Sequence, residues 1–395
     1  MVAALGVCSF NAFAADYDCG KVPGTVTCSL SADGKTLTVN GTGEMKNYQN
    51  SDSRPWLSTI ESVVVSPTVT SIGERAFKGA SKLTNVTMPG VKTLENSAFN
   101  GTKLVSVDMP SVTTIGQSAF ENVTTLQSIS APNATTVGDK AFFTDANKTP
   151  SLTSVDLPKA TQIGGQAFQN AKALTSVNIP LATELKYDAF ASATNLENVY
   201  APNVETLGDR VFKSCSSLES IDLPSLTTIG ENAFNDATSL TEINMPNIQY
   251  IGKNAFYNSG LTSVDMPNLI EMDDRAFAYS SNLYYVGMPE SATLKNWRHF
   301  EGTQVTSGCT TVNGYKNCGT CNRYIMSGKG CVASCGKNYL PEDGRCVLSQ
   351  CDDDKVFYKG ACLDEYPFAK KRYTPAEANQ WLNDDENIIT ITYKK

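Results

Sequence analysis

The residue types that carry out most protein catalysis are scarce in this chain. There is one histidine, His299, among 395 residues, so a catalytic triad or a histidine-based metal site would depend on it alone. No matching arrangement of Cys or Asp surrounds it, and we expect an ordinary surface or edge histidine. The P-loop, G-x-S-x-G and H-E-x-x-H motifs do not occur in the sequence. We therefore predict that the protein is not an enzyme and uses no cofactor or metal.

Binding is the chemistry for which the sequence provides residues at a regular spacing. Polar side chains stand four positions after the leading leucine of a repeat: Asp108, Asp156, Asn178, Tyr200, Asp222, Asn244 and Asp265. Serines stand two positions before most of them, and Tyr284 and Tyr285 lie near the end of the series. A polar and acidic ladder with exposed aromatics suits a basic or polyhydroxylated partner. The alternative is that these residues only solvate an exposed sheet.

The cysteines indicate an oxidising compartment. Twelve are present, and we expect Cys19 to bond with Cys28. A second set crowds into 309–362: Cys309, Cys318, Cys321, Cys331, Cys335, Cys346, Cys351 and Cys362. The C-x-x-C at Cys318 and Cys321 occurs in redox and zinc sites, but this density favours a disulfide framework. Pairing of nearest neighbours and an interlaced 331–346, 335–351 pattern both stay open.

A repeat sets the positions of the polar columns. Eleven units begin at Ile60, Leu83, Leu104, Leu126, Leu152, Leu174, Leu196, Leu218, Leu240, Leu261 and Leu283. A period in the low twenties is typical of a solenoid with one turn of chain per repeat. The one long step, of 26 residues, comes from 142–152, and we expect it to bulge away from the sheet.

Each unit predicts one strand followed by turns. In 218–235, LESIDLPSLTTIGENAFN, apolar and polar residues alternate up to Pro224, so stacked units should form a parallel sheet on one face. Proline ends each strand because it has no N–H for the ladder. The opposite wall needs only turns or short 3-10 segments. It contains Leu226 and Ile229 and their equivalents, with a column of phenylalanines from Phe77 to Phe277 ended by Phe300.

Two smaller features of the repeat have consequences for backbone and reactivity. Glycine follows the second apolar pair in seven of ten units, and the exceptions indicate that no glycine-only backbone angle is obligatory there. Cys215 occupies a column of small residues, so we expect a buried and unreactive thiol.

The first 14 residues predict a signal peptide. They are apolar and end in Ala12-Phe13-Ala14, which fits the rule for cleavage before Ala15. The basic front end of such a signal is missing, so we expect a trimmed signal or a start codon further upstream. A lipoprotein attached at Cys8 is less favoured because Val7 precedes it.

Residues 15–58 predict a β cap for the solenoid. Two alternating runs flank Ala32-Asp33-Gly34-Lys35, and Asp-Gly between such runs is a strong hairpin signal. The first coil of a solenoid must be covered, and we expect Trp56 to plug it.

Three further segments follow the cap: repeats over 59–300, a cysteine-rich module over 301–365 and a tail over 366–395. In the tail, Thr374, Pro375 and Glu377 predict the start of a short helix, and 388–393 predicts a strand. We expect the tail to dock on the module. The net charge of −8 argues against nucleic-acid partners, and no apolar run is long enough to span a membrane.

The repeat, as in LTTIGENAFNDATSLTEINMP, resembles the BspA-like leucine-rich repeat over residues 60–300. LSADGKTLTVNGTGEMKNY followed by PW resembles the cap before such repeats, and GKGCVASCGKNYLPEDGRCVLSQC is similar to furin-like or growth-factor-receptor cysteine repeats. The resemblance implies a leucine-rich-repeat solenoid with a disulfide-built extracellular module. It also implies export to the surface of a host-associated bacterium and binding rather than catalysis.

We therefore expect a mainly β, extracellular or cell-surface protein with an adhesin-like role. Its partners would be an extracellular protein or glycan, such as host matrix, mucin or another cell surface, bound through the sheet face. The alternative is a structural protein that self-associates in a surface layer, end to end or through the C-terminal module.

Overall fold

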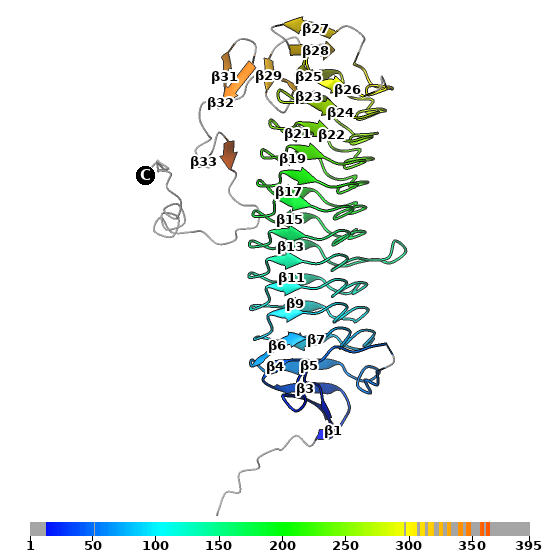
Figure 1. Ribbon diagram of the computed structural model, residues 1–395. Helices are drawn as coiled ribbons and strands as arrows, with labels where there is room; N and C mark the ends of the chain where they lie inside the picture. The colour runs from blue at the N-terminus through cyan, green and yellow to red at the C-terminus, as the bar shows by residue number, and fades with distance from the viewer. Residues whose placement is uncertain are drawn as a thin grey trace, which may run out of the picture.

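The computed structural model describes residues 13–50, 52–295 and 298–305, and beyond them only the strands β27 to β34. Within this part the chain forms strands and turns and no helix. Its coils stack into a long parallel β-solenoid with one coil per repeat (Figure 1). The predictions for residues 1–12 and for the tail 366–395, and the sulfur atoms of the C-terminal cysteines, lie outside the described residues.

The predicted sheet forms the first wall of the solenoid. Its strands are β5 (Ser62–Val65), β7 (Asn85–Thr87), β9 (Ser106–Asp108), β11 (Ser128–Ser130), β13 (Ser154–Asp156), β15 (Ser176–Asn178), β17 (Asn198–Tyr200), β19 (Ser220–Asp222), β21 (Glu242–Asn244), β23 (Ser263–Asp265) and β25 (Tyr285–Pro289). Their central residues point inward and are mostly buried. The hydrogen-bonded ladder is interrupted, and its longest uninterrupted part runs from β13 to β21.

The opposite wall differs from the prediction, because it is a second parallel sheet rather than turns or 3-10 segments. Twelve strands form it without a break: β4 (Gly43–Glu44), β6 (Val69–Ile72), β8 (Thr93–Leu94), β10 (Thr114–Ile115), β12 (Thr136–Val137), β14 (Gln162–Ile163), β16 (Glu184–Leu185), β18 (Thr206–Leu207), β20 (Thr228–Ile229), β22 (Tyr250–Ile251), β24 (Glu271–Met272) and β26 (Thr293–Leu294). From β8 to β24 each two-residue strand turns its first residue outward and its second into the core. Stacking alone supplies the ladder partners of such short segments.

The turns that follow the strands of the second sheet form a third side, which we call the turn wall. In each coil these turns contain the recurring phenylalanine of the repeat, such as Phe99 in residues 95–101. In this wall the N–H groups of Ser97, Phe99 and Gly101 donate to the carbonyls of Gln117, Ala119 and Glu121 of the next coil. Equivalent bonds recur along the solenoid. The backbone turns there through left-handed residues, for which the first column is Arg75, Ser97, Ser118, Lys140, Gln166, Asp188, Arg210, Asn232, Asn254 and Arg275.

The phenylalanines form the predicted column in the core. Successive ring centroids from Phe77 to Phe277 lie 4.9–5.7 Å apart, and Phe300 continues the stack at 6.0 Å. The rings lie nearly parallel, with 2° between Phe168 and Phe190. Because a buried aromatic removes 150–250 Å² from water by the usual figure, about the largest area of any side chain, this column is a main source of stability.

The repeated glycine behaves as the sequence predicts. Gly116 and its equivalents after the second strand do not have positive φ. A Cβ on Gly116 would nevertheless lie 2.6 Å from the carbonyl oxygen of Leu94. Close approach of the neighbouring coil therefore favours glycine, and a local shift admits Glu95, Lys186 and Asp273.

The N-terminal cap contains the predicted hairpin. Strands β2 (Val26–Ser31) and β3 (Thr36–Gly41) pair antiparallel, and β1 (Phe13–Asp18) adds to β2 with regular register from Ala15 onward. Strand β3 then pairs in parallel with β5, so the cap continues the first wall. Trp56 is buried against Tyr17 and Tyr48, and a disulfide joins Cys19 to Cys28.

The other end of the first wall is covered by antiparallel strands. Strand β25 pairs with β28 (Tyr315–Gly319), which pairs with β27 (Cys309–Val312). The remaining strands are β29 (Tyr324–Met326), β30 (Gly330–Val332), β31 (Tyr339–Glu342), β32 (Arg345–Leu348), β33 (Val356–Tyr358) and β34 (Ala361–Leu363). His299 is 2 % exposed, so the expectation of a surface histidine is wrong: the last coil encloses it. The described residues include no helix with the length and apolar character of a membrane span.

Candidate partner-binding face

Five of the seven predicted partner-binding residues lie on one uninterrupted sheet. Asp156 pairs in register with Asn178, Asn178 with Tyr200, Tyr200 with Asp222, and Asp222 with Asn244. Because adjacent parallel strands lie about 4.8 Å apart, the five side chains form a column along the outer face of β13–β21. We call this column the β13–β21 stack.

The other two predicted residues lie apart from this stack. Asp108 is exposed on β9, in a separate two-stranded sheet. Asp265 on β23 is fully buried, although its position in the strand is the same. The two tyrosines near the end of the series also differ, because Tyr284 is exposed whereas Tyr285 is buried. The expectation that both tyrosines are exposed is therefore wrong for Tyr285.

Amide groups in the β13–β21 stack donate to neighbouring carboxylates. Asn178 Nδ2 donates to Asp156 Oδ1, and Asn244 Nδ2 donates to Asp222 Oδ1. The Oδ1 atom of Asn178 is buried and accepts no hydrogen bond from the described residues. Exchanging the two amide atoms would place Oδ1 against the carboxylate of Asp156, so the hydrogen-bond network fixes this orientation. Each amide thus uses one of its two N–H donors within the stack, and Oδ1 of Asn178 lacks a donor among the described residues.

Tyr200 stands at the centre of the stack. Its side chain is half-buried, and burial followed by the negative charge of Asp222 raises the pKa of its phenol above the ordinary value. The phenol is therefore neutral at physiological pH. An aromatic ring between the amide of Asn178 and the carboxylate of Asp222 can receive a cation on its face or pack against an apolar surface.

Leu181 is a residue of this face that the sequence analysis missed. It is 46 % exposed and follows the proline that ends the Asn178 strand. Other coils carry polar residues there, and Asn203 and Asn247 donate from this position to the carbonyls of Pro180 and Pro224. The signal was therefore present in the sequence, because Leu181 is the one large apolar residue in a column that otherwise contains Gly90 and polar side chains.

Other chemistry is sparse in the described part of the chain. No group of three His, Cys, Asp or Glu residues there could hold a metal ion. Cys215 is a buried free thiol, as predicted, and burial raises its pKa to about 12.

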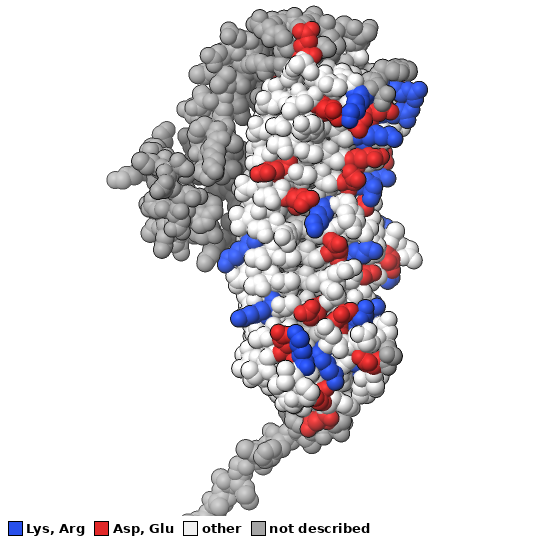
Figure 2. Space-filling view, viewed as in Figure 1, with Lys and Arg blue, Asp and Glu red and all other residues white. Residues whose placement is uncertain are grey.

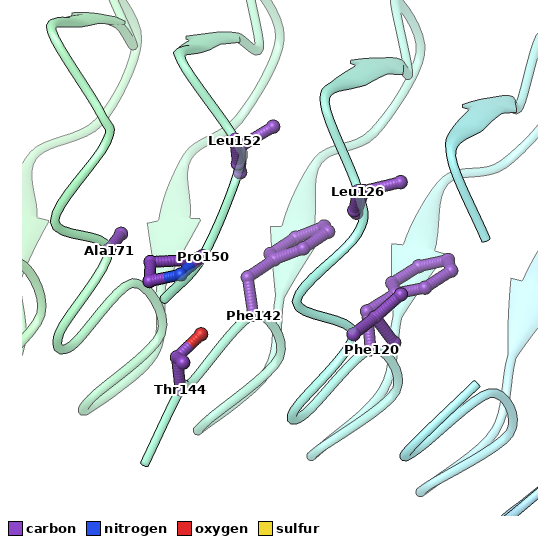
Figure 3. Close-up of a pocket in the computed structure, with 8 residues that line it drawn as sticks. Phe120, Leu126, Phe142, Thr144, Pro150, Leu152 and Ala171 are labelled. Carbon is purple, nitrogen blue, oxygen red and sulfur yellow. The ribbon is translucent and has the colours of Figure 1, made fainter. Parts of the chain in front are cut away.

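A small cavity lies beside the long repeat. It has a volume of about 10 Å³ and is lined by Phe120, Phe142, Thr144 and Pro150, among others (Figure 3). A cavity of this volume can hold about one water molecule. The cavity marks a packing defect at the inserted loop and is too small for an organic ligand.

Charged residues are unevenly distributed in the view of Figure 2. Lysine, arginine, aspartate and glutamate lie more densely along the right-hand side, and wide areas of this face show neither sign. On the outer face of β13–β21 the charges are the carboxylates of Asp156, Asp222 and Glu242. Isolated acidic groups on a largely uncharged surface give the β13–β21 stack a local negative potential.

Solved structures of other leucine-rich-repeat proteins are similar to this chain. A leucine-rich repeat protein from Eubacterium ventriosum has 21% identity and a TM-score of 0.40, covering 76% of this chain and 100% of its own. A leucine rich cell surface protein from Faecalibacterium prausnitzii has 20% identity and a TM-score of 0.38, covering 73% and 93%. The pneumococcal vaccine antigen PcpA has 16% identity and a TM-score of 0.37, covering 66% and 81%.

Sequence comparison identifies the repeats. No curated protein matches the chain. The family model of the BspA type leucine rich repeat region matches residues 56–172, 135–247 and 205–318, which together make up about two thirds of the sequence. With these matches and the solenoid of stacked coils, the chain belongs to the BspA-type leucine-rich-repeat family.

Proposed function

We propose that this protein is exported, acts outside the cell or on its surface, and binds a host or cell-surface protein or glycan through the outer face of β13–β21. The role is adhesin-like and involves no catalysis. The β13–β21 stack carries the proposal, because it places five polar and aromatic side chains in register on one rigid sheet. Membership of the BspA-type family and the structural similarity to bacterial surface proteins support an extracellular setting.

A rigid sheet suits binding because its side chains lose little freedom on complex formation. The strands are held on both sides by neighbouring coils, and buried phenylalanines support them from within. Preorganised contacts keep more of their interaction free energy than contacts on mobile loops do. Each coil also adds another row to the face, so a long partner can make repeated contacts.

The test is a binding array of the oxidised chain against matrix proteins, mucins and glycans. A triple variant, Asp156→Lys, Asp222→Lys and Glu242→Lys, reverses the three exposed charges of this face and should lose most of the binding to whichever partner is found. The control variant Asp16→Lys, Glu184→Lys and Glu290→Lys changes net charge equally at exposed positions outside this face, and should bind normally. Equal binding by both variants would show that the face is not the site.

Structural self-association is the alternative function. Both ends of the first wall are covered in the described part of the chain, by β1–β3 at one end and by β28 and β27 at the other. Direct stacking of first wall on first wall would require these strands to move aside. The covered ends therefore favour the binding role over end-to-end assembly.

A further inference from the structure

The β13–β21 stack contains one buried polar atom that has no partner among the described residues. Asn178 is 1 % exposed, one N–H of its Nδ2 donates to Asp156, and its Oδ1 accepts no hydrogen bond from the described part of the chain. A buried acceptor left without a donor destabilises the folded chain, because the atom has lost its hydrogen bonds to water. Such a cost on the outer column of a sheet points to a ligand that supplies the donor.

From this we infer that the stack binds a lysine or arginine side chain of a protein partner, whose N–H groups donate to Asn178 Oδ1 and to the carboxylate of Asp156 beside the ring of Tyr200. This inference deepens the proposed function and rests on it. It names the partner as a basic polypeptide segment rather than a sugar.

Hydrogen-bond polarity separates these two classes of partner. A sugar hydroxyl both donates and accepts, so sugar sites present donors and acceptors together. Here each amide group of the stack uses one of its two N–H donors on a carboxylate within it, so the carboxylate of Asp156 and Oδ1 of Asn178 leave acceptors in excess of the one remaining N–H of Asn178. An ammonium or guanidinium group offers only donors and brings the opposite charge.

The surroundings of Asn178 fit the rest of a basic side chain. Tyr200 is its register partner in β17, and an aromatic face attracts a cation. Leu181, exposed three residues beyond Asn178, offers an apolar contact to the aliphatic stem of lysine or arginine. The charge of Asp222, one coil beyond Tyr200, adds to the local negative potential.

The experiment measures binding of fluorescent octalysine to the full chain by polarisation, with octaglutamate and maltoheptaose as comparison probes. We expect octalysine to bind, octaglutamate not to bind, and maltoheptaose not to compete. Asp156→Asn should weaken octalysine binding about threefold. Asn178→Leu should weaken it by at least as much while leaving the melting temperature equal or higher, because it removes a buried unsatisfied acceptor.

Asp108→Asn is the matched control, because it removes the same charge from the same position of another coil and should leave the affinity unchanged. An equal loss in Asp108→Asn and Asp156→Asn would mean that only net charge attracts the peptide, and the inference would fall. It would fall also if maltoheptaose bound and Asn178→Leu abolished that binding. In either case the proposed function would still stand if the partner found in the binding array no longer bound the triple charge-reversal variant.

Discussion

The turns of every coil depend on residues with a left-handed backbone conformation, and most of these residues are not glycine. The second column in the turns reads Gly79, Gly101, Asn122, Asn170, Ser192, Ser214, Asp236, Asn258, Tyr279 and Gly302. Glycine, asparagine and aspartate favour this conformation, so seven of these ten positions could be predicted from sequence, whereas Ser192, Ser214 and Tyr279 could not. The first column includes Arg75, Lys140 and Arg210, which have no such preference. Hydrogen bonds between coils hold them there, and a single repeat does not show those bonds.

Cys215 gives a prediction about reactivity. Its pKa is raised to about 12 by burial, so the reactive thiolate is almost absent at pH 8. We expect the peptide containing Cys215 to resist maleimide labelling in the folded protein and to label completely in guanidinium, as measured by mass spectrometry. Rapid labelling of the folded protein would mean that this part of the turn wall opens often.

Tyr200 gives a prediction about pH. Its pKa is raised in the folded state, so the folded chain holds the phenolic proton more tightly than the unfolded chain does. The resulting stability is complete below the unfolded value of 10.0 and is lost as pH rises from there through the folded pKa.

The variant Tyr200→Phe should therefore lose less stability than the parent between about pH 9 and pH 11. Urea unfolding midpoints of both proteins at the two pH values measure this, and the shared tyrosines cancel in the comparison. Equal losses in both proteins would contradict the raised pKa.

At the scale of elements, the sequence predicts strands better where they are longer. Three-residue strands such as Ser220–Asp222 alternate apolar and polar residues and end near a proline. The alternation predicts the strand, and the proline predicts where it ends. Two-residue strands such as Thr228–Ile229 have no period of their own. Their partners lie one repeat away, so only the stacking of whole coils turns them into a sheet. The division of the first wall, which isolates Asp108 from the β13–β21 stack, could not be predicted for the same reason.

The long repeat allows an element-scale test. Residues 146–149 lie in the loop that protrudes beside β13 (Figure 1), as the sequence predicts, and deleting them restores a spacing of 22 residues. The deletion removes the exposed ion pair of Lys148 with Asp145, which is worth at most about 1 kcal/mol.

We expect the deletion variant to fold and its free energy of unfolding to change by no more than about 1 kcal/mol, as measured by urea titration. Deleting 206–209, which removes strand β18 (Thr206–Leu207), is the control and should disrupt the solenoid. Loss of folding in the first variant would show that the loop supports its coil.

The register of β27 and β28 predicts one disulfide. Cys309 lies opposite Cys318 in the antiparallel pair, and directly opposed residues have Cα atoms about 4.5–5.5 Å apart, within the range of disulfides. This favours nearest-neighbour pairing at the start of the C-terminal module. Peptide mapping of the unreduced protein should recover a Cys309–Cys318 cross-link, and a Cys318–Cys321 cross-link would contradict it.

In the whole molecule, the free energy of unfolding depends mainly on contacts between adjacent coils, because the coils form a linear stack. Each coil contacts the coils before and after it, so a weakened coil in the middle divides the solenoid, whereas a weakened end only frays. The repeat period alone predicts this architecture, which is why the overall shape could be predicted although the partner could not.

Two matched variants test this coupling. Phe190→Ala and Phe277→Ala each remove one buried ring from the stack and should cost about 3–5 kcal/mol locally. Hydrogen exchange should speed up on both sides of the coil in Phe190→Ala, but mainly beyond residue 260 in Phe277→Ala. Identical exchange patterns would indicate that the solenoid unfolds as a single unit.

The backbone hydrogen bonds of the turn wall also give this wall an electrical direction. Their N–H groups point toward the C-terminal coil and their carbonyls toward the cap, as in Ser97 to Gln117 and Ser118 to Asp139. Aligned peptide units add their dipoles, as they do in a helix. At the cap end of this wall the guanidinium of Arg54 donates to the carbonyl of Arg75. The second sheet has the opposite polarity, because the N–H of Gly116 donates to the carbonyl of Leu94 in the preceding coil. The solenoid therefore carries opposed rows of peptide dipoles on two of its walls, and a charged molecule that approaches one end meets both signs there.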